Sequence, residues 1–296
     1  MTPESVTSAP APGDSQALNH LGCLRVSGND RVSFLQGQVT SDIAGLQGGK
    51  GGLTSHCNRQ GRVFATALAV PTDDAIILVM PAEQVEDLRK RLAMFVFRAR
   101  VTLDNATDAL PLTAAWQAPT DGPGDAIWRT ASLPDGRLAV RYPGTQARWL
   151  MIGGASDEPD AAGRWRFEDI SAGLGQVFAA TREEFLPQAL NLDALGGISF
   201  EKGCYVGQEI IARLHFRGTV KRRMRLLFAA AGEPAVPGSG VQSADKTVGK
   251  VVDSASDGQR TAILAVCPVA TPSDGLRLES GAELRAGDLP YELPAS

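Results

Sequence analysis

The residues best suited to chemistry lie in one segment, Gly197 to Arg225, which reads GISFEKGCYVGQEIIARLHFRGTVKRRMR. Cys204 stands there just ahead of a predicted helix that begins at Gly207, and Lys202 lies two residues before it. A helix N-terminus and a nearby ammonium both favour the thiolate form of a cysteine. Cys204 is therefore a candidate nucleophile, redox thiol or transient metal ligand. The competing interpretation is a small buried hydrophobic residue, as most free cysteines are.

Two glycines flank this cysteine, and a basic run follows it. Gly203 and Gly207 permit unusual backbone geometry and the close approach of a ligand. Six basic residues occur without an intervening acid: Arg213, Arg217, Lys221, Arg222, Arg223 and Arg225. A local cluster of this kind can bind an anionic ligand although the whole chain carries a net charge of -4. A charge run is more often a solvated surface, and both interpretations stay open.

The composition excludes several classes of protein. The chain has 296 residues, 43% of them hydrophobic and 21% charged, which is typical of a folded domain protein. No apolar run approaches the ~20 residues that span a bilayer, and no signal peptide is recognisable, so we expect a cytoplasmic protein with no membrane partner. The four cysteines and three histidines are not grouped at metal-ligand spacing. We therefore expect no resident metal.

The elements that would position these residues follow from hydrophobic periodicity. Apolar alternation predicts an antiparallel sheet, and an apolar stripe from Val85 to Val96 predicts a helix after Pro81. The expected strands of this α+β unit cover residues 23–26, 53–57, 63–70, 75–80 and 100–103. Expected strands of a second region cover 112–116, 127–128, 137–142 and 148–152, and a helix starts near Trp165 after a linker-like stretch.

The last part of the chain shows short strands with no helical period, over residues 224–230, 247–253 and 261–266. This pattern predicts a small C-terminal β-barrel. The fold class is therefore α+β, with antiparallel sheets, helices and a barrel. We divide the chain into a flexible tail over 1–16, an α+β domain over 17–106, a second α+β domain over 107–222 that carries KGCYVGQE, and the barrel over 223–296.

The residues around Cys204 resemble the signature of the YgfZ folate-binding proteins, relatives of the aminomethyltransferase (T-protein) of the glycine cleavage system. The signature K-G-C-Y-x-G-Q-E is matched by Lys202, Gly203, Cys204, Tyr205, Gly207, Gln208 and Glu209. The resemblance continues through Phe185-Leu-Pro-Gln188 and reaches Phe34-Leu-Gln-Gly-Gln-Val-Thr40 near the start. It covers nearly the whole chain beyond the tail.

This resemblance implies a three-domain ring, with tetrahydrofolate or a one-carbon derivative bound near its central hole. It also implies a role in assembling or repairing iron-sulfur proteins, including tRNA methylthiolation enzymes. Trp165 matches one of two tryptophans associated with the folate, and the other falls at Leu21 here. The glutamate tail of a folate needs cations, which we assign to Arg213, Arg217, Lys221 and Arg222. Cys204 and Lys202 are then the reactive residues, and the other signature residues shape the motif.

Two alternatives remain open. A folate-dependent aminomethyl or methyl transferase, or a demethylase, fits the superfamily. The stretch that holds an aspartate in the T-protein corresponds here to Ala65-Thr66, which offers no carboxylate. An RNA-binding module is the second alternative; net acidity weighs against it, and we expect no direct nucleic-acid contact. Whether the protein turns over a substrate is left open.

Overall fold

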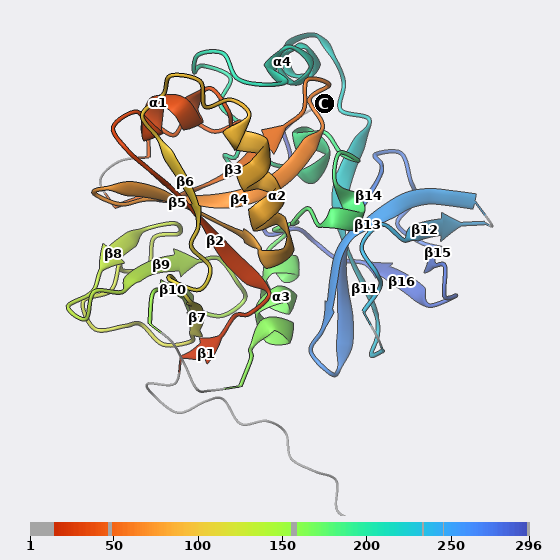
Figure 1. Ribbon diagram of the computed structural model, residues 1–296. Helices are drawn as coiled ribbons and strands as arrows, with labels where there is room; N and C mark the ends of the chain where they lie inside the picture. Colours follow the sequence, from red (N-terminus) through yellow and green to blue (C-terminus); the bar gives the residue numbers. More distant parts are fainter. Residues whose placement is uncertain (1–14, 47–48, 155–158, 233, 245, 295–296) are drawn as a thin grey trace, which may run out of the picture.

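The computed structural model describes residues 15–46, 49–154, 159–232, 234–244 and 246–294. Within these residues the chain forms two antiparallel five-stranded sheets and a closed barrel (Figure 1). The expected tail over 1–16 lies mostly outside the described residues. Its last residue, Gln16, belongs to a short strand instead.

The first sheet has the strand order β3-β4-β5-β2-β6. Its strands are β2 (Leu21–Ser27), β3 (Gly52–Cys57), β4 (Val63–Pro71), β5 (Ala75–Pro81) and β6 (Thr102–Asn105). Two helices belong to this region, α1 (Arg31–Gln36) and α2 (Ala82–Ala93). The apolar stripe of α2 buries Val85, Leu88 and Leu92 against the sheet, as the periodicity predicts. The helix ends earlier than expected, and Phe95 packs on the same core from the following loop.

The second sheet has the order β1-β7-β10-β9-β8. Its strands are β1 (Gln16–Ala17), β7 (Leu112–Ala115), β8 (Thr130–Ser132), β9 (Leu138–Tyr142) and β10 (Arg148–Ile152). The expected hairpin of β9 and β10 is confirmed. The strand expected at 127–128 is wrong, because Trp128 has a left-handed backbone with φ of 66° and the strand starts after it. The two sheets share one core, which contains Leu68 and Val79 from the first and Val140 and Leu150 from the second.

A closed antiparallel barrel forms the C-terminal part, so the expected β-barrel is confirmed. Its strands are β11 (Arg222–Ala230), β12 (Gly240–Ser243), β13 (Lys246–Ser256), β14 (Arg260–Pro268), β15 (Leu276–Leu278) and β16 (Glu283–Ala286). Closure leaves no long sheet edge open to pairing with another chain. The predicted α+β class with antiparallel sheets is likewise confirmed. The domain boundaries stay predictions; β11 begins one residue before the expected boundary at 223.

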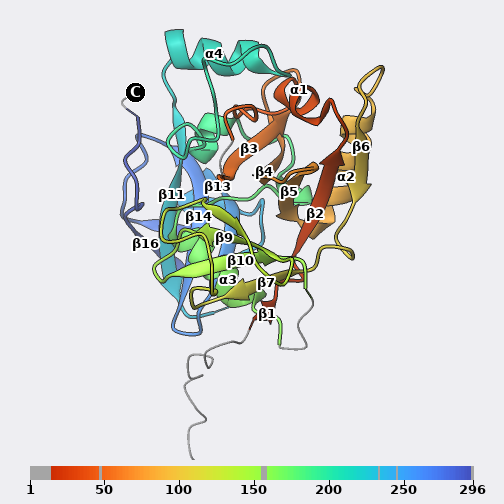
Figure 2. The ribbon, with the colours of Figure 1, turned by 90° about the vertical axis from the view of Figure 1, so that its left-hand side faces the viewer.

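Three parts of the chain connect the sheets to the barrel. Helix α3 (Ala162–Ser171) lies between the second sheet and the barrel, as both views show (Figures 1 and 2). An ion pair between Arg166 and Asp253 joins α3 to β13. Two short 3-10 helices follow, η1 (Ala179–Thr181) and η2 (Pro187–Leu190), and then α4 (Gln208–Arg217) at one end of the molecule (Figure 1). Among the described residues, no helix is long and apolar enough to cross a membrane.

Candidate functional site

The KGCYVGQE segment forms a surface loop that leads into α4. Cys204 is exposed, whereas Cys23, Cys57 and Cys267 are buried. Burial raises the pKa of Cys57 to about 12, so that thiol stays protonated at neutral pH. The interpretation of Cys204 as a buried hydrophobic residue is therefore wrong. Its thiol is the accessible one of the four.

Gly207 explains how this loop enters the helix. Its φ is 83°, and a Cβ added there would lie 2.5 Å from the carbonyl oxygen of Asn58. Gly61, with φ of 73°, lies on the other side of this contact, so two backbone segments meet without side chains between them. Gly203 has open space around it, and its φ lies outside the left-handed region. The backbone therefore requires a glycine at position 207 and not at position 203.

Lys202 ties the motif to the first sheet region. Its Nζ donates hydrogen bonds to the carbonyl oxygens of Gln36, Val39 and Ser41, at 2.7, 2.6 and 2.7 Å. Burial lowers the pKa of Lys202 to about 8. Its ammonium also lies 4.9 Å from the ring centroid of Tyr205. These contacts commit the ammonium to holding the loop, and the role of Lys202 as a reactive partner of Cys204 stays a prediction.

The remaining signature residues shape the surface beside the cysteine. The ring of Tyr205 is buried, and its hydroxyl has no hydrogen-bond partner within the described part of the chain. Tyr205, Gln208 and Glu209 line a shallow pocket of about 410 Å³ together with Phe95. Glu209 lies in the first turn of α4, where a carboxylate is favoured by the helix dipole. This pocket places polar groups next to the Cys204 loop.

Trp165 lies in the core shared by the two sheets and is fully buried. Its ring packs 5.0 Å from the ring of Tyr142, and the guanidinium of Arg148 lies 4.2 Å from its centroid. The ring therefore has no exposed face on which a ligand could stack. Tyr142 lines the inner pocket described below, and Trp165 packs against Tyr142 without lining that pocket.

The basic run divides into separate uses. Arg213 and Arg217 are exposed on α4, and Arg223 makes a buried ion pair with Asp193 at 2.6 Å. Arg225 bonds to Thr271 and Ser273 of the barrel. Lys221 and Arg222 line a pocket near the barrel to which Trp165 does not belong. The structure does not bring Trp165 and the predicted tail-binding cations into one pocket.

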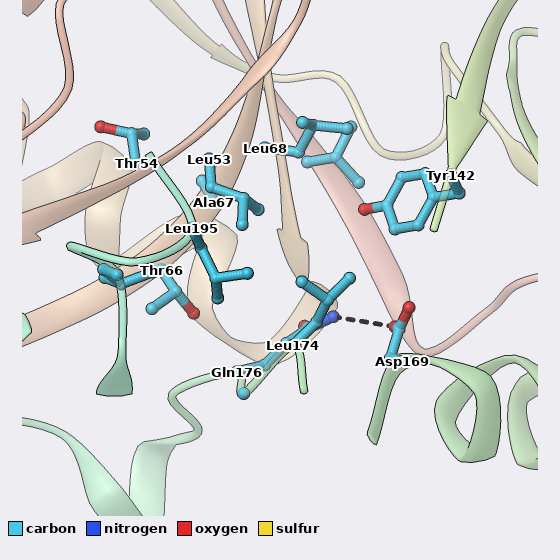
Figure 3. A pocket seen from close by; sticks show the side chains of 13 residues that line it. Leu53, Thr54, Thr66, Ala67, Leu68, Tyr142, Asp169, Leu174, Gln176 and Leu195 are labelled. Atoms are coloured by element: carbon cyan, nitrogen blue, oxygen red, sulfur yellow. Dashed lines mark hydrogen bonds between the residues drawn. The ribbon is translucent and has the colours of Figure 1, made fainter. Parts of the chain in front are cut away.

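A different pocket, here called the inner pocket, was not predicted from the sequence (Figure 3). Leucine side chains make up much of its lining, and polar side chains lie among them on more than one side. The residues that line it are Leu53, Thr54, Thr66, Ala67, Leu68, Val79, Tyr142, Asp169, Leu174, Gly175, Gln176, Leu192 and Leu195. Thr66 belongs to the stretch where the T-protein resemblance would place an aspartate.

Asp169 supplies the carboxylate of the inner pocket. It lies on α3 and is buried, and Arg148 Nη2 donates to its Oδ1 at 2.6 Å. Gln176 Nε2 donates to its Oδ2 at 3.4 Å, a contact drawn in Figure 3. Burial raises the pKa of Asp169 to about 6, and Arg148 opposes part of that rise. In the sequence Asp169 is one of two adjacent acids in the stretch FEDISAG, and no local pattern distinguishes it from Glu168.

An outer pocket of about 360 Å³ adjoins the inner one, because Leu174 and Leu195 line both. Trp128 lines the outer pocket, and its ring lies 4.9 Å from that of Tyr142. A bulky residue with positive φ stores backbone strain, which is frequent at functional sites. Ser171 Oγ, also in this lining, is buried and has no partner among the described residues. The outer pocket therefore offers an aromatic wall and an unsatisfied hydroxyl.

The described residues contain no group of three or more His, Cys, Asp or Glu side chains placed to hold a metal ion. The candidate site is thus built from an apolar slot, a buried ion pair and a separate exposed thiol. Cys204 lines neither the inner nor the outer pocket.

Comparison with known proteins identifies relatives over most of the chain. The chain is 28% identical over 302 residues to the tRNA-modifying protein YgfZ of Vibrio vulnificus (strain YJ016). The alignment covers 93% of this chain and 91% of that protein. The tRNA-modifying protein YgfZ of Yersinia pestis (strain Pestoides F) is 29% identical over 254 residues, covering 79% and 76%. The chain is similar to these YgfZ proteins over most of its length. The resemblance predicted from the KGCYVGQE signature is confirmed.

The fold of the chain matches that of a solved structure. The glycine cleavage system aminomethyltransferase T of Bartonella henselae superposes with a TM-score of 0.69 at 15% identity, covering 93% of this chain and 85% of that chain. This likeness shows a T-protein-like fold, as expected. No family model matches the chain.

Proposed function

We propose that the protein acts in the cytoplasm as a tetrahydrofolate-binding accessory factor for the assembly or repair of iron-sulfur proteins, including tRNA-modifying enzymes, with Cys204 as its reactive group. The observation that supports the folate part is the inner pocket, a mostly apolar pocket whose lining includes the buried carboxylate of Asp169. Homology to tRNA-modifying proteins supports the class of client.

The polar and apolar groups that line the inner pocket are suited to binding a pteridine ring. The ring of a reduced folate presents an amide N–H and an amino group on one edge, and a carboxylate such as Asp169 accepts hydrogen bonds from both. Leucines pack against the faces of such a ring. A bound reduced folate would supply one-carbon chemistry, because it carries such units on N5, in the ring, and on N10, outside it.

Side-chain movement is part of this proposal. The inner pocket as it stands encloses about 30 Å³, roughly the share of one water molecule. Leu174 and Leu195 separate it from the outer pocket. Rotation of these two side chains would join the pockets and give the ring access past Trp128. The free energy of this local rearrangement therefore reduces the observed binding affinity.

The residues behind the slot have positioning roles. Arg148 neutralises and orients Asp169, while Trp165 packs on Arg148 and Tyr142. Trp165 acts in this proposal through Tyr142 and not by stacking on the folate. The cations assigned to the glutamate tail, Arg213, Arg217, Lys221 and Arg222, line neither pocket, and that assignment stays a prediction.

Calorimetric titration with tetrahydrofolate tests the binding site. Leu195→Trp fills the passage between the two pockets without touching the ion pair, and we expect it to weaken binding at least about tenfold. Phe216→Trp makes a similar change on exposed α4 and is the matched control. Unchanged affinity in Leu195→Trp, or no saturable binding by the wild type, would contradict the pocket assignment.

The reactive thiol is tested separately. Cys204→Ser keeps nearly the same volume at an exposed position, so we expect an unchanged fold and folate affinity. Activity of iron-sulfur tRNA-modifying enzymes in cells that lack the native protein should nevertheless fall. Full complementation by the serine variant would remove Cys204 from the mechanism.

One observation favours a second candidate, a folate-dependent transferase. Asp169 shares the inner pocket with Thr66, so a carboxylate with a pKa of about 6 is present although the expected stretch lacks one. Chromatography of folate incubated with aminomethyl or methyl donors distinguishes the two. Saturable binding without a one-carbon product supports the accessory factor, and turnover that Asp169→Asn abolishes supports the transferase.

A further inference from the structure

A pocket of about 560 Å³, here called the basic pocket, lies where the start of β4, the segment around η2, α4 and the barrel meet. Its lining mixes cations with apolar side chains. The residues are Arg62, Glu184, Phe185, Leu186, Ala189, Leu214, Thr219, Val220, Lys221, Arg222, Lys250 and Val266. None of them lines the inner or the outer pocket, so the basic pocket is a separate cavity.

Positive charge dominates this cavity. Four of its residues are cationic, and the one carboxylate, on Glu184, is paired with Lys250 at 2.9 Å. Arg62, Lys221 and Arg222 have no acidic side chain within ion-pair distance in the described part of the chain. Like charges that face one cavity repel each other, and a bound anion relieves that repulsion.

Backbone contacts hold the two guanidinium groups in place without neutralising them. Arg62 Nη1 donates to the carbonyl oxygen of Glu184 at 2.5 Å. The amide of Val63 bonds to the carbonyl of Phe185 at 2.8 Å, which fixes the chain beside Arg62. Arg222 Nη2 donates to the carbonyls of two barrel residues at 3.2 and 3.3 Å. These charges are therefore positioned before any ligand arrives.

The apolar part of the wall adds a second requirement. Phe185, Leu214 and Val220 face the same cavity as the cations. We propose that the basic pocket binds a small organic anion that carries two or more phosphate or carboxylate groups on an apolar body. Cationic side chains pair with the oxyanions, and the apolar wall covers the body. This proposal does not depend on folate binding in the inner pocket.

Calorimetry with two simple probes, inorganic pyrophosphate and tricarballylate, tests the anion site on the full chain. Lys221→Ala and Arg62→Ala each remove one cation from the pocket, and we expect either change to weaken probe binding about tenfold. Arg98→Ala is the matched control, because it removes the same charge from an exposed position outside the pocket. A preference for pyrophosphate indicates a phosphate ligand, and a preference for tricarballylate indicates a polycarboxylate.

A fluorescent aromatic anion, 1-anilinonaphthalene-8-sulfonate, tests the apolar wall. Leu214→Ser should weaken its binding severalfold while pyrophosphate affinity is retained. The proposal is overturned if neither pyrophosphate nor tricarballylate binds, or if Arg98→Ala weakens their binding as much as Lys221→Ala does. It is also overturned if Lys221→Ala weakens the binding of tetrahydrofolate and leaves the affinity for pyrophosphate unchanged. Lys221 would then bind the glutamate tail of the folate.

Discussion

In the KGCYVGQE loop the candidate reactive group is exposed and its neighbours are used for packing, whereas in the inner pocket the candidate group is itself buried. Cys204 faces solvent while Lys202 is bound to three carbonyl oxygens. Asp169 is enclosed and held by Arg148. Most residues of the contiguous motif thus hold the loop in place around one exposed thiol. The buried carboxylate of the inner pocket is instead stabilised by a guanidinium from a distant segment of the chain.

We expect the largest effect on stability from breaking the buried ion pair between Arg148 and Asp169. Arg148→Met leaves Asp169 buried without its partner, and we expect the free energy of unfolding to fall by about 3–5 kcal/mol. Urea denaturation followed by circular dichroism measures it. The double variant Arg148→Met/Asp169→Leu should recover most of the loss, because no buried charge is left unpaired.

The control for this prediction is an exposed pair. Arg137 and Asp135 lie 2.7 Å apart at the surface of the second sheet region. Arg137→Met should leave the unfolding transition unchanged. An equal loss in Arg137→Met and Arg148→Met would show that burial does not set the importance of the inner pair.

His56 tests whether the stability of the region that holds the KGCYVGQE loop also depends on a buried neutral group. Its Nδ1 contacts the Gln38 carbonyl at 2.8 Å, in the segment that Lys202 anchors, and burial lowers its pKa to about 4. Because the folded pKa lies below the ordinary 6.5, the protein is more stable above pH 6.5 and loses that contribution as the pH falls toward 4. The contribution is up to about 3 kcal/mol.

His56→Gln should flatten the dependence of unfolding free energy on pH between 7 and about 4. Denaturation series at several pH values measure this slope. Exposed His215, replaced in the same way, is the control. A wild-type slope retained in His56→Gln would mean that other groups control acid sensitivity on this side.

The two motif glycines give a smaller, matched contrast. Gly207→Ala places a Cβ against the Asn58 carbonyl at a left-handed position, and we expect a loss of about 1–3 kcal/mol. Gly203→Ala meets open space and should be close to neutral. Urea denaturation of both variants checks this. Equal losses would contradict the packing role assigned to Gly207.

The smallest effect on stability is expected at Cys204. Native protein treated with a thiol reagent should label one of its four cysteines quickly, because the other three are buried. Cys204→Ser should abolish fast labelling and leave the unfolding transition where it was. Fast labelling that persists in this variant would show that a buried thiol becomes accessible, which would weaken the contrast between the two regions.

Much of the fold could be predicted because its signals are local. Short runs bounded by turn residues predicted β3, β4 and β5, and helical spacing predicted α2. The strand expected at 127–128 failed because the left-handed backbone of Trp128 depends on its place against the second sheet. Strand propensity within a few residues carries no record of that contact.

The amino-acid sequence alone predicted the resemblance to YgfZ proteins, the α+β class, the barrel and the place of Cys204 ahead of a helix, because these follow from neighbouring residue types and a contiguous signature. Only the tertiary structure decided which polar groups are buried. It enclosed Trp165, turned Lys202 toward three carbonyls and divided the basic run among separate contacts. It also joined Thr66, Tyr142 and Asp169 into one pocket. Burial and charge pairing depend on segments that are distant in the chain, and no local pattern records which of them meet.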